Sequence, residues 1–196
     1  MFPKSRLRLA SGKRVQLLER LAQYSLDCAL LPMPIGEEPF HVQQISQSPL
    51  VICMRADDPL SFASCLDLEE IASRLTIFRD PELQPAAHRR LEEMFNELGV
   101  PINLTCSAST PADLQWMVKS GYGLALIDQT TSLEAGLITK PIAGVNWTAD
   151  TAFVIHNRAD HIALPFLERS LAKQWTDPKR KRRSISVQPE QLKLLA

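Results

Sequence analysis

Long apolar segments are missing from this 196-residue sequence, although 45% of its residues are hydrophobic. The longest apolar runs, such as Leu124 to Ile127, are far too short to cross a bilayer. The N-terminus enters an alternation of arginine and leucine at residues 6–9, with no apolar block typical of a signal peptide. We therefore expect a cytoplasmic protein with no membrane partner.

Metal-ligating residues are few and scattered. The cysteines occur singly, without the spacing of a zinc or redox motif, and the histidines show no HExxH-type pairing. We therefore expect buried free thiols, no metal and no cofactor. The residues concerned are Cys28, Cys53, Cys65 and Cys106, and His41, His88, His156 and His161.

Motifs for catalysis are also lacking. The sequence has no Ser/His/Asp or Cys/His constellation, no Walker loop and no strand–GxGxxG–helix unit. Asp57 and Asp58 are adjacent, as are Glu92 and Glu93, and neighbours in a helix or strand point apart, so solvated faces explain these pairs. We expect that the protein is not an enzyme.

A formal net charge of zero conceals an asymmetry along the chain. Five of the 22 basic residues form the run 179–183, and without them 17 basic residues face 22 acidic ones, a balance of −5. The mildly acidic body is a poor electrostatic candidate for binding DNA. We expect residues 176–196, which contain this run, to form a basic and largely disordered tail.

Apolar runs bounded by turn residues alternate with helical periodicity along most of the chain, which indicates an α/β fold. Leu7 and Leu9 alternate with arginines as a strand, and Val15, Leu17, Leu18 and Leu21 mark the buried stripe of a helix. We expect further strands at 26–31, 75–78, 102–106, 124–127, 137–142 and 151–156, and an extended segment at 42–54 broken at Pro49. Further helices are expected at 66–72, 85–98, 112–120 and 162–175.

One stretch, residues 114–128, carries an apolar helix through Gly-x-Gly into a short buried strand. Ser109 to Asp113 is a clear helix start, since Pro111 suits the first turn and Asp113 suits the helix dipole. Gly121 and Gly123 follow this helix instead of opening one. We therefore expect them to serve tight backbone geometry, not phosphate binding.

The order of these pieces resembles the effector-binding domain of LysR-type transcriptional regulators, over residues 5 to 175. The matching pieces are Leu7-Arg-Leu-Ala-Ser-Gly12, Ser48-Pro-Leu-Val-Ile-Cys53 with Asp58-Pro-Leu60 behind it, the loop 107–110, Val118 to Gly123, and Pro165-Phe-Leu167. The resemblance implies a type-2 periplasmic-binding-protein-like fold with two lobes joined by two crossovers. Lobe I would hold residues 1–47 plus 142–175, and lobe II residues 48–141.

Two parts of the family pattern are not found in this sequence. The winged helix-turn-helix has no counterpart, so we expect no direct sequence-specific DNA binding. The strand and helix that open lobe I in the family are also missing, which makes lobe I incomplete and would expose strand edges. We expect a marginally stable product or a homo-oligomer that forms through the exposed edge. Alternatively, the chain pairs with a LysR-type paralogue through the helix expected at 85–98.

The resemblance also places a small-molecule effector in the cleft between the lobes. The carried-over positions are Ser11, Gly12, Lys13, Arg14 and Pro32 on lobe I, and Arg79, Ser107, Ser109 and Thr110 on lobe II. Hydroxyls, cations and a helix N-terminus would suit a carboxylate, so the expected effector is an anionic metabolite. Alternatively, Ser109 and Thr110 merely cap their helix, and Lys13 and Arg14 lie in a solvated loop.

The function that follows is effector sensing for a LysR-type regulator. Two alternatives stay open. One is a stand-alone small-solute-binding protein. The other is a regulator remnant that acts at most by pairing with a full-length paralogue.

Overall fold

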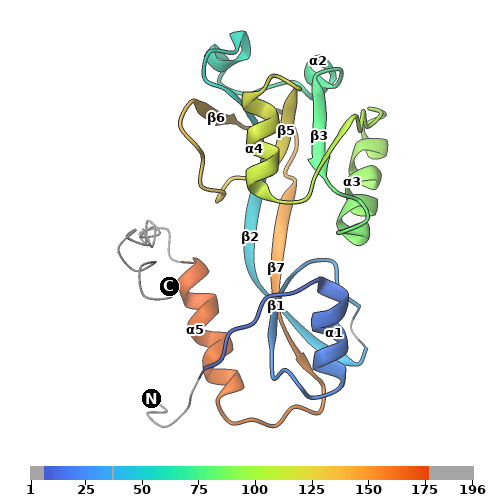
Figure 1. Ribbon diagram of the computed structural model, residues 1–196, viewed down its shortest axis with the longest axis vertical. Coiled ribbons are helices and arrows are strands. Elements are labelled where there is room, and N and C mark those ends of the chain that lie inside the picture. Colours follow the sequence, from blue (N-terminus) through green and yellow to red (C-terminus); the bar gives the residue numbers. More distant parts are fainter. Residues whose placement is uncertain (1–6, 37, 177–196) are drawn as a thin grey trace, which may run out of the picture.

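Two long strands, β2 (Phe40–Arg55) and β7 (Thr148–His156), pair antiparallel and run between two groups of elements (Figure 1). The structure is a computed structural model that describes residues 7–36 and 38–176. We call the group at the ends of β2 and β7 that holds α1, β1 and α5 lobe I. The group that holds β3 to β6 and α2 to α4 is called lobe II.

Lobe I is a three-stranded antiparallel sheet with a helix on each face. β1 (Ala29–Pro32) pairs with β7, which pairs with the first half of β2. Successive side chains of β7 point to opposite faces. Ala152 and Val154 therefore pack under α1 (Arg14–Ala22), while Phe153 packs under α5 (Leu164–Thr176). This alternation of buried side chains along β7 holds α1 on one face of the sheet and α5 on the other.

Lobe II is a five-stranded sheet in the order β6-β2-β5-β3-β4. β3 pairs in parallel with both β5 and β4, whereas β2 pairs antiparallel with β5 and β6. The carboxyl ends of β3 and β5 therefore lie at the same edge, toward lobe I. The elements are β3 (Leu75–Arg79), β4 (Cys106–Ala108), β5 (Leu124–Asp128), β6 (Leu137–Lys140), the 3-10 helix η1 (Pro59–Phe62), α2 (Leu68–Ile71), α3 (Pro85–Glu97) and α4 (Pro111–Lys119).

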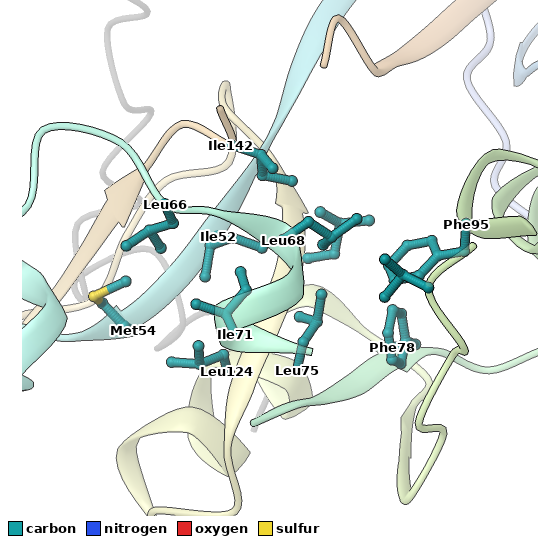
Figure 2. Packing of buried hydrophobic residues seen from close by; sticks show 12 residues of the cluster. Ile52, Met54, Leu66, Leu68, Ile71, Leu75, Phe78, Phe95, Leu124 and Ile142 are labelled. Carbon is teal, nitrogen blue, oxygen red and sulfur yellow. The ribbon is translucent and has the colours of Figure 1, made fainter. Parts of the chain in front are cut away.

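The largest core of the molecule lies on the face of lobe II that α2 and α3 cover (Figure 2). Ile52 and Leu124 come from neighbouring strands, and Phe78 meets Phe95 of α3 edge to face with ring centroids 6.1 Å apart. The opposite face packs against α4 through Leu114 and Val118. Burial on both faces explains why the strands of lobe II read as continuous apolar runs.

The strand expected at Leu7 and Leu9 does not form. Residues 7–13 lie in neither helix nor strand, and the side chains of Leu7 and Leu9 are 70% and 88% exposed. Among the described residues, β1 pairs only with β7, and no strand runs beside residues 7–9. A strand needs a partner for its backbone N–H and C=O groups, so the alternating pattern alone does not create one.

Two further expectations about strands are wrong in detail. β2 is continuous through Pro49, and its irregularity lies between Gln44 and Ser46 instead. Pro49 is tolerated where β2 leaves β7 and begins to pair with β5, and its carbonyl still accepts from the N–H of Gln129 at 2.9 Å. The strand expected at 102–106 forms instead at Cys106–Ala108, because β3 pairs with these three residues.

Candidate functional site

A cavity of about 540 Å³ opens at the junction of the two lobes. Lobe I contributes the end of β1 and the residues after it, Pro32 to Pro34, and lobe II contributes the carboxyl ends of β3 and β5. Most of the remaining wall comes from α3 and from residues 146–151, which lead into β7 and form its first part. In open α/β folds, ligands bind beyond the carboxyl ends of strands, so the position suits a ligand site.

One face of α3 forms a side of the cavity. Gln84 just before the helix is followed by Ala87, His88, Leu91 and Met94, at the spacing of three and four residues that keeps side chains on one face. Together with the strand residues Leu50, Phe78 and Leu126, they make the wall largely apolar. Such a wall can hold the carbon skeleton of a small molecule.

Trp147 closes the cavity between the start of β7 and α3. Its ring lies 5.0 Å from that of Phe95, centroid to centroid, at an interplanar angle of 32°. Its backbone carbonyl accepts a hydrogen bond from the N–H of Leu50 at 2.8 Å. The cavity is therefore bordered by residues that are themselves fixed by the core of lobe II and by the crossover strands.

Arg79 ends β3 at the cavity, where burial lowers the pKa of its guanidinium, while the charge of Asp128 partly opposes that shift. The guanidinium of Arg79 makes no hydrogen bond or ion pair within the described part of the chain, although its backbone belongs to the pairing of β3 with β4. Asp128 is already engaged, because its Oδ1 accepts from Ser48 Oγ at 2.5 Å and from the N–H and Oγ1 of Thr130 at 2.6 and 2.7 Å. A desolvated cation with no bonded carboxylate favours binding of an anion.

Asp150, in β7, also lines the cavity. Its carbonyl accepts from the N–H of Met33 at 2.9 Å and so helps to hold β1. Its side-chain atom Oδ1 is buried and has no hydrogen-bond partner. A buried carboxylate oxygen in that state is unfavourable unless a donor reaches it.

The structure brings two of the nine predicted binding residues, Pro32 and Arg79, to the cavity wall. Arg14 lies behind that wall, where it donates to the carbonyl of Pro32 at 3.3 Å and to the carbonyl of Pro34, and burial lowers its pKa. Thr110 caps α4, since its Oγ1 accepts from the N–H of Asp113 at 3.1 Å. The other five are exposed and outside the cavity wall: Ser11, Gly12, Lys13, Ser107 and Ser109. Ligand binding by the nine residues stays a prediction.

Sequence reasoning missed most of the cavity wall, including His88, Asp128, Trp147 and Asp150. His88 falls within the helix expected at 85–98, but its place in the same wall as β7 depends on how the lobes meet. Asp150 stands two residues after Thr148, and its sequence context carries no signal for ligand binding. The one usable signal was that Asp128 and Asp150 stand directly beside the ends of the strands expected at 124–127 and 151–156.

No group of three or more His, Cys, Asp and Glu side chains that could hold a metal ion occurs in the described ranges, 7–36 and 38–176. No helix in the described part of the chain is long and apolar enough to cross a membrane.

Comparison with known proteins gives a consistent result. The family model for the LysR substrate binding domain matches residues 1–170. The HTH-type transcriptional regulator BudR of Raoultella terrigena is 26% identical over 130 residues, which are 66% of this chain and 45% of BudR. The chain thus spans under half the length of that curated relative.

Solved structures show the same fold. The LysR family regulator HinK from Pseudomonas aeruginosa superposes with a TM-score of 0.80 at 17% identity, over 89% of this chain and 61% of HinK. The BenM effector binding domain, solved with its effector benzoate, superposes with a TM-score of 0.75 at 16% identity, over 91% of this chain and 84% of that domain. The expected fold class is confirmed. The chain belongs to the LysR substrate-binding-domain family, with a type-2 periplasmic-binding-protein-like fold.

Proposed function

We propose that this chain senses a small carboxylate, which binds in the cavity between lobe I and lobe II and thereby regulates transcription. The observation that carries the proposal is Arg79, a desolvated cation without a bonded carboxylate in the wall of an apolar cavity of about 540 Å³. The likeness to the BenM effector domain, whose effector benzoate is a carboxylate, supports the same ligand chemistry.

The proposed response to ligand binding is a change in the relative orientation of the two lobes. The cavity wall combines residues of both lobes, so a ligand that contacts both favours the arrangement in which its contacts are complete. Only β2 and β7 connect the lobes within the described residues, and strand crossovers of this kind can act as hinges. The ligand would shift the population of lobe arrangements that a DNA-binding partner reads.

The test is thermal unfolding of the protein with a library of small carboxylates and of uncharged molecules of similar size. A carboxylate at about 100 times its Kd stabilises the folded state by about 2.7 kcal/mol, which raises Tm by about 5–10 °C. The Ala87→Phe variant, which fills the cavity from α3, should lose this shift. If no carboxylate raises Tm, or if the shift persists in Ala87→Phe, the proposal is wrong.

Arg79→Met keeps the aliphatic part of the side chain and removes the charge. Loss of a charge-assisted hydrogen bond should weaken binding of a carboxylate about ten-fold to a hundred-fold. Arg89→Met is the matched control, because Arg89 is an exposed arginine of α3 outside the cavity wall. Equal affinities of the two variants would contradict a role for Arg79.

A further inference from the structure

The titratable side chains in the cavity wall fall into two groups. Three have partners: Arg90 bonds Glu93 at 3.2 Å, His88 Nε2 lies 3.3 Å from Glu92 Oε1, and Asp128 Oδ1 accepts from Ser48 and Thr130. Two have no hydrogen bond or ion pair to a described residue at the atoms concerned: the guanidinium of Arg79 and Oδ1 of Asp150. These are the two charged groups of the cavity wall that no described residue satisfies at the atoms concerned.

Arg79 and Asp150 do not form an ion pair with each other. They stand on β3 and β7, and two strands, β5 and β2, separate these in the sheet order. The charge that acts on Arg79 comes from Asp128, whose Oδ1 already accepts three hydrogen bonds inside the protein. The cavity wall thus contains a cation on β3 and a carboxylate on β7, together with apolar side chains such as Leu50 and Leu91.

We propose that the ligand is a zwitterion of the amino-acid type, whose carboxylate binds Arg79 and whose ammonium group donates to Asp150 Oδ1. The proposal rests on the proposed function and adds the second charged group. The ammonium supplies the donor that the buried oxygen lacks, and the opposite charges of the ligand match the two available charges of the wall. Leu50, Phe78 and Leu91 line the same cavity and would contact the carbon skeleton of this ligand.

A plain carboxylate would satisfy Arg79 and leave Asp150 Oδ1 without a donor, while adding a second negative charge to the same cavity. A site built to bond a polar group of its ligand rejects analogues that lack that group. The structure therefore predicts discrimination within pairs of acids that differ only by the amine. The discrimination should exceed about ten-fold in Kd.

The experiment titrates the full chain by calorimetry and thermal shift with matched pairs of probes. The pairs are L-phenylalanine and hydrocinnamate, L-leucine and isocaproate, and δ-aminovalerate and valerate, with phenyllactate as the hydroxyl analogue of the first pair. We expect at least one amine-bearing member to bind, and its deaminated counterpart to bind about ten-fold more weakly or not at all. The proposal is overturned if the deaminated acids bind equally well, if phenyllactate binds best, or if no amine-bearing probe binds.

Asp150→Asn tests the residue itself, since it removes the charge and keeps the shape. We expect the preference for the amine to disappear, while the affinity for the deaminated acid is unchanged or improved. Asp160→Asn is the matched control, an exposed aspartate outside the cavity wall. A preference that survives in Asp150→Asn overturns the assignment. The comparison of probe pairs on the unmodified protein remains decisive even if Asp150→Asn does not fold.

The failure of this inference is distinguishable from failure of the proposed function. Binding of deaminated carboxylates that depends on Arg79 and is blocked in Ala87→Phe would leave effector sensing intact and refute only the zwitterion. If no carboxylate of any kind binds, both proposals fall.

Discussion

Ser48 donates its hydroxyl hydrogen to Oδ1 of Asp128 across 2.5 Å, which joins a crossover strand to the end of β5. Ser48 is only 3% exposed, and it stands beside Pro49, where β2 exchanges its partner β7 for β5. The same carboxylate oxygen organises the turn after β5 through Thr130. This contact therefore fixes the lobe II end of the crossover, next to the cavity.

Ser48→Ala removes the donor from this contact and leaves a charged oxygen with fewer hydrogen bonds. We expect the free energy of unfolding to fall by about 1–3 kcal/mol. Urea unfolding followed by circular dichroism measures the loss. Ser64→Ala, at an exposed serine away from the crossovers, should leave the midpoint unchanged, and equal midpoints for the two variants would contradict the importance of the contact.

Gly123→Ala should be among the most damaging single changes in lobe II. A Cβ at Gly123 would lie 2.1 Å from Thr76 Oγ1 and 2.7 Å from the carbonyl oxygen of Arg74, at a φ of +144°. Because backbone as well as side chain must move, we expect a loss of about 3 kcal/mol or more, measured by urea unfolding. Gly136→Ala is the control, since Gly136 also has a positive φ, +86°, but open space around it. Its cost should be about 1–2 kcal/mol, the strain of the left-handed backbone alone.

The ion pair between Asp58 and Arg74 should make stability depend on pH. A hydrogen bond from Arg74, with Nη1 3.2 Å from Oδ1, holds the pKa of Asp58 below its ordinary value. A lowered folded pKa means that the stabilisation is present above the unfolded pKa of about 3.9 and is lost as the pH falls through the folded value. Arg74 is 44% exposed at its side chain, so Arg74→Met should cost at most about 1 kcal/mol at pH ~7.

The measurement for this pair is urea unfolding of the unmodified protein and Arg74→Met across the acid range. Their difference in unfolding free energy should shrink once the pH drops below about 4. Arg89→Met, which removes an exposed arginine, provides the reference. A difference that stays constant down to the acid limit would refute the assignment to Asp58.

Cys53 should resist alkylation in the folded protein. It is fully buried in β2, and burial raises the pKa of its thiol to about 11, so little reactive thiolate forms near pH 8. Cys65 is exposed and should react first with iodoacetamide. Peptide mass mapping before and after unfolding in urea distinguishes the sites. Labelling of Cys53 as fast as Cys65 under native conditions would mean that β2 opens far more readily than its packing suggests.

Elements with strong local signals were predicted well. α3 begins at Pro85 and ends before Gly99, whose φ of +69° suits the turn after a helix. α4 begins at Pro111 behind the Thr110 cap, and its capping box with Asp113 lies within four consecutive residues. Signals of this kind act between near neighbours, so the order of residues already contains them.

Strand predictions failed where strand formation depends on a neighbouring strand that is distant in sequence. Leu7 and Leu9 show the alternation of a strand but remain exposed, because no described strand runs beside them. Pro49 reads as a break, yet β2 continues through it because its neighbours β7 and β5 accommodate the change of pairing. Hydrogen bonds between strands are made with distant residues, so their presence cannot be read from the segment alone.

The cavity shows most clearly which features local sequence determines and which depend on tertiary packing. By itself, the sequence determined the α/β alternation, the helix caps, the family resemblance and the positions of Pro32 and Arg79 at strand ends. Only the tertiary structure decided that Trp147 and Asp150 line the same cavity, that Arg14 is held by the carbonyls of Pro32 and Pro34, and that Thr110 lies outside the cavity wall. The reason is physical: periodicity and capping act over a few residues, whereas a site between two lobes is assembled by packing between segments more than a hundred residues apart, such as β1 and β7.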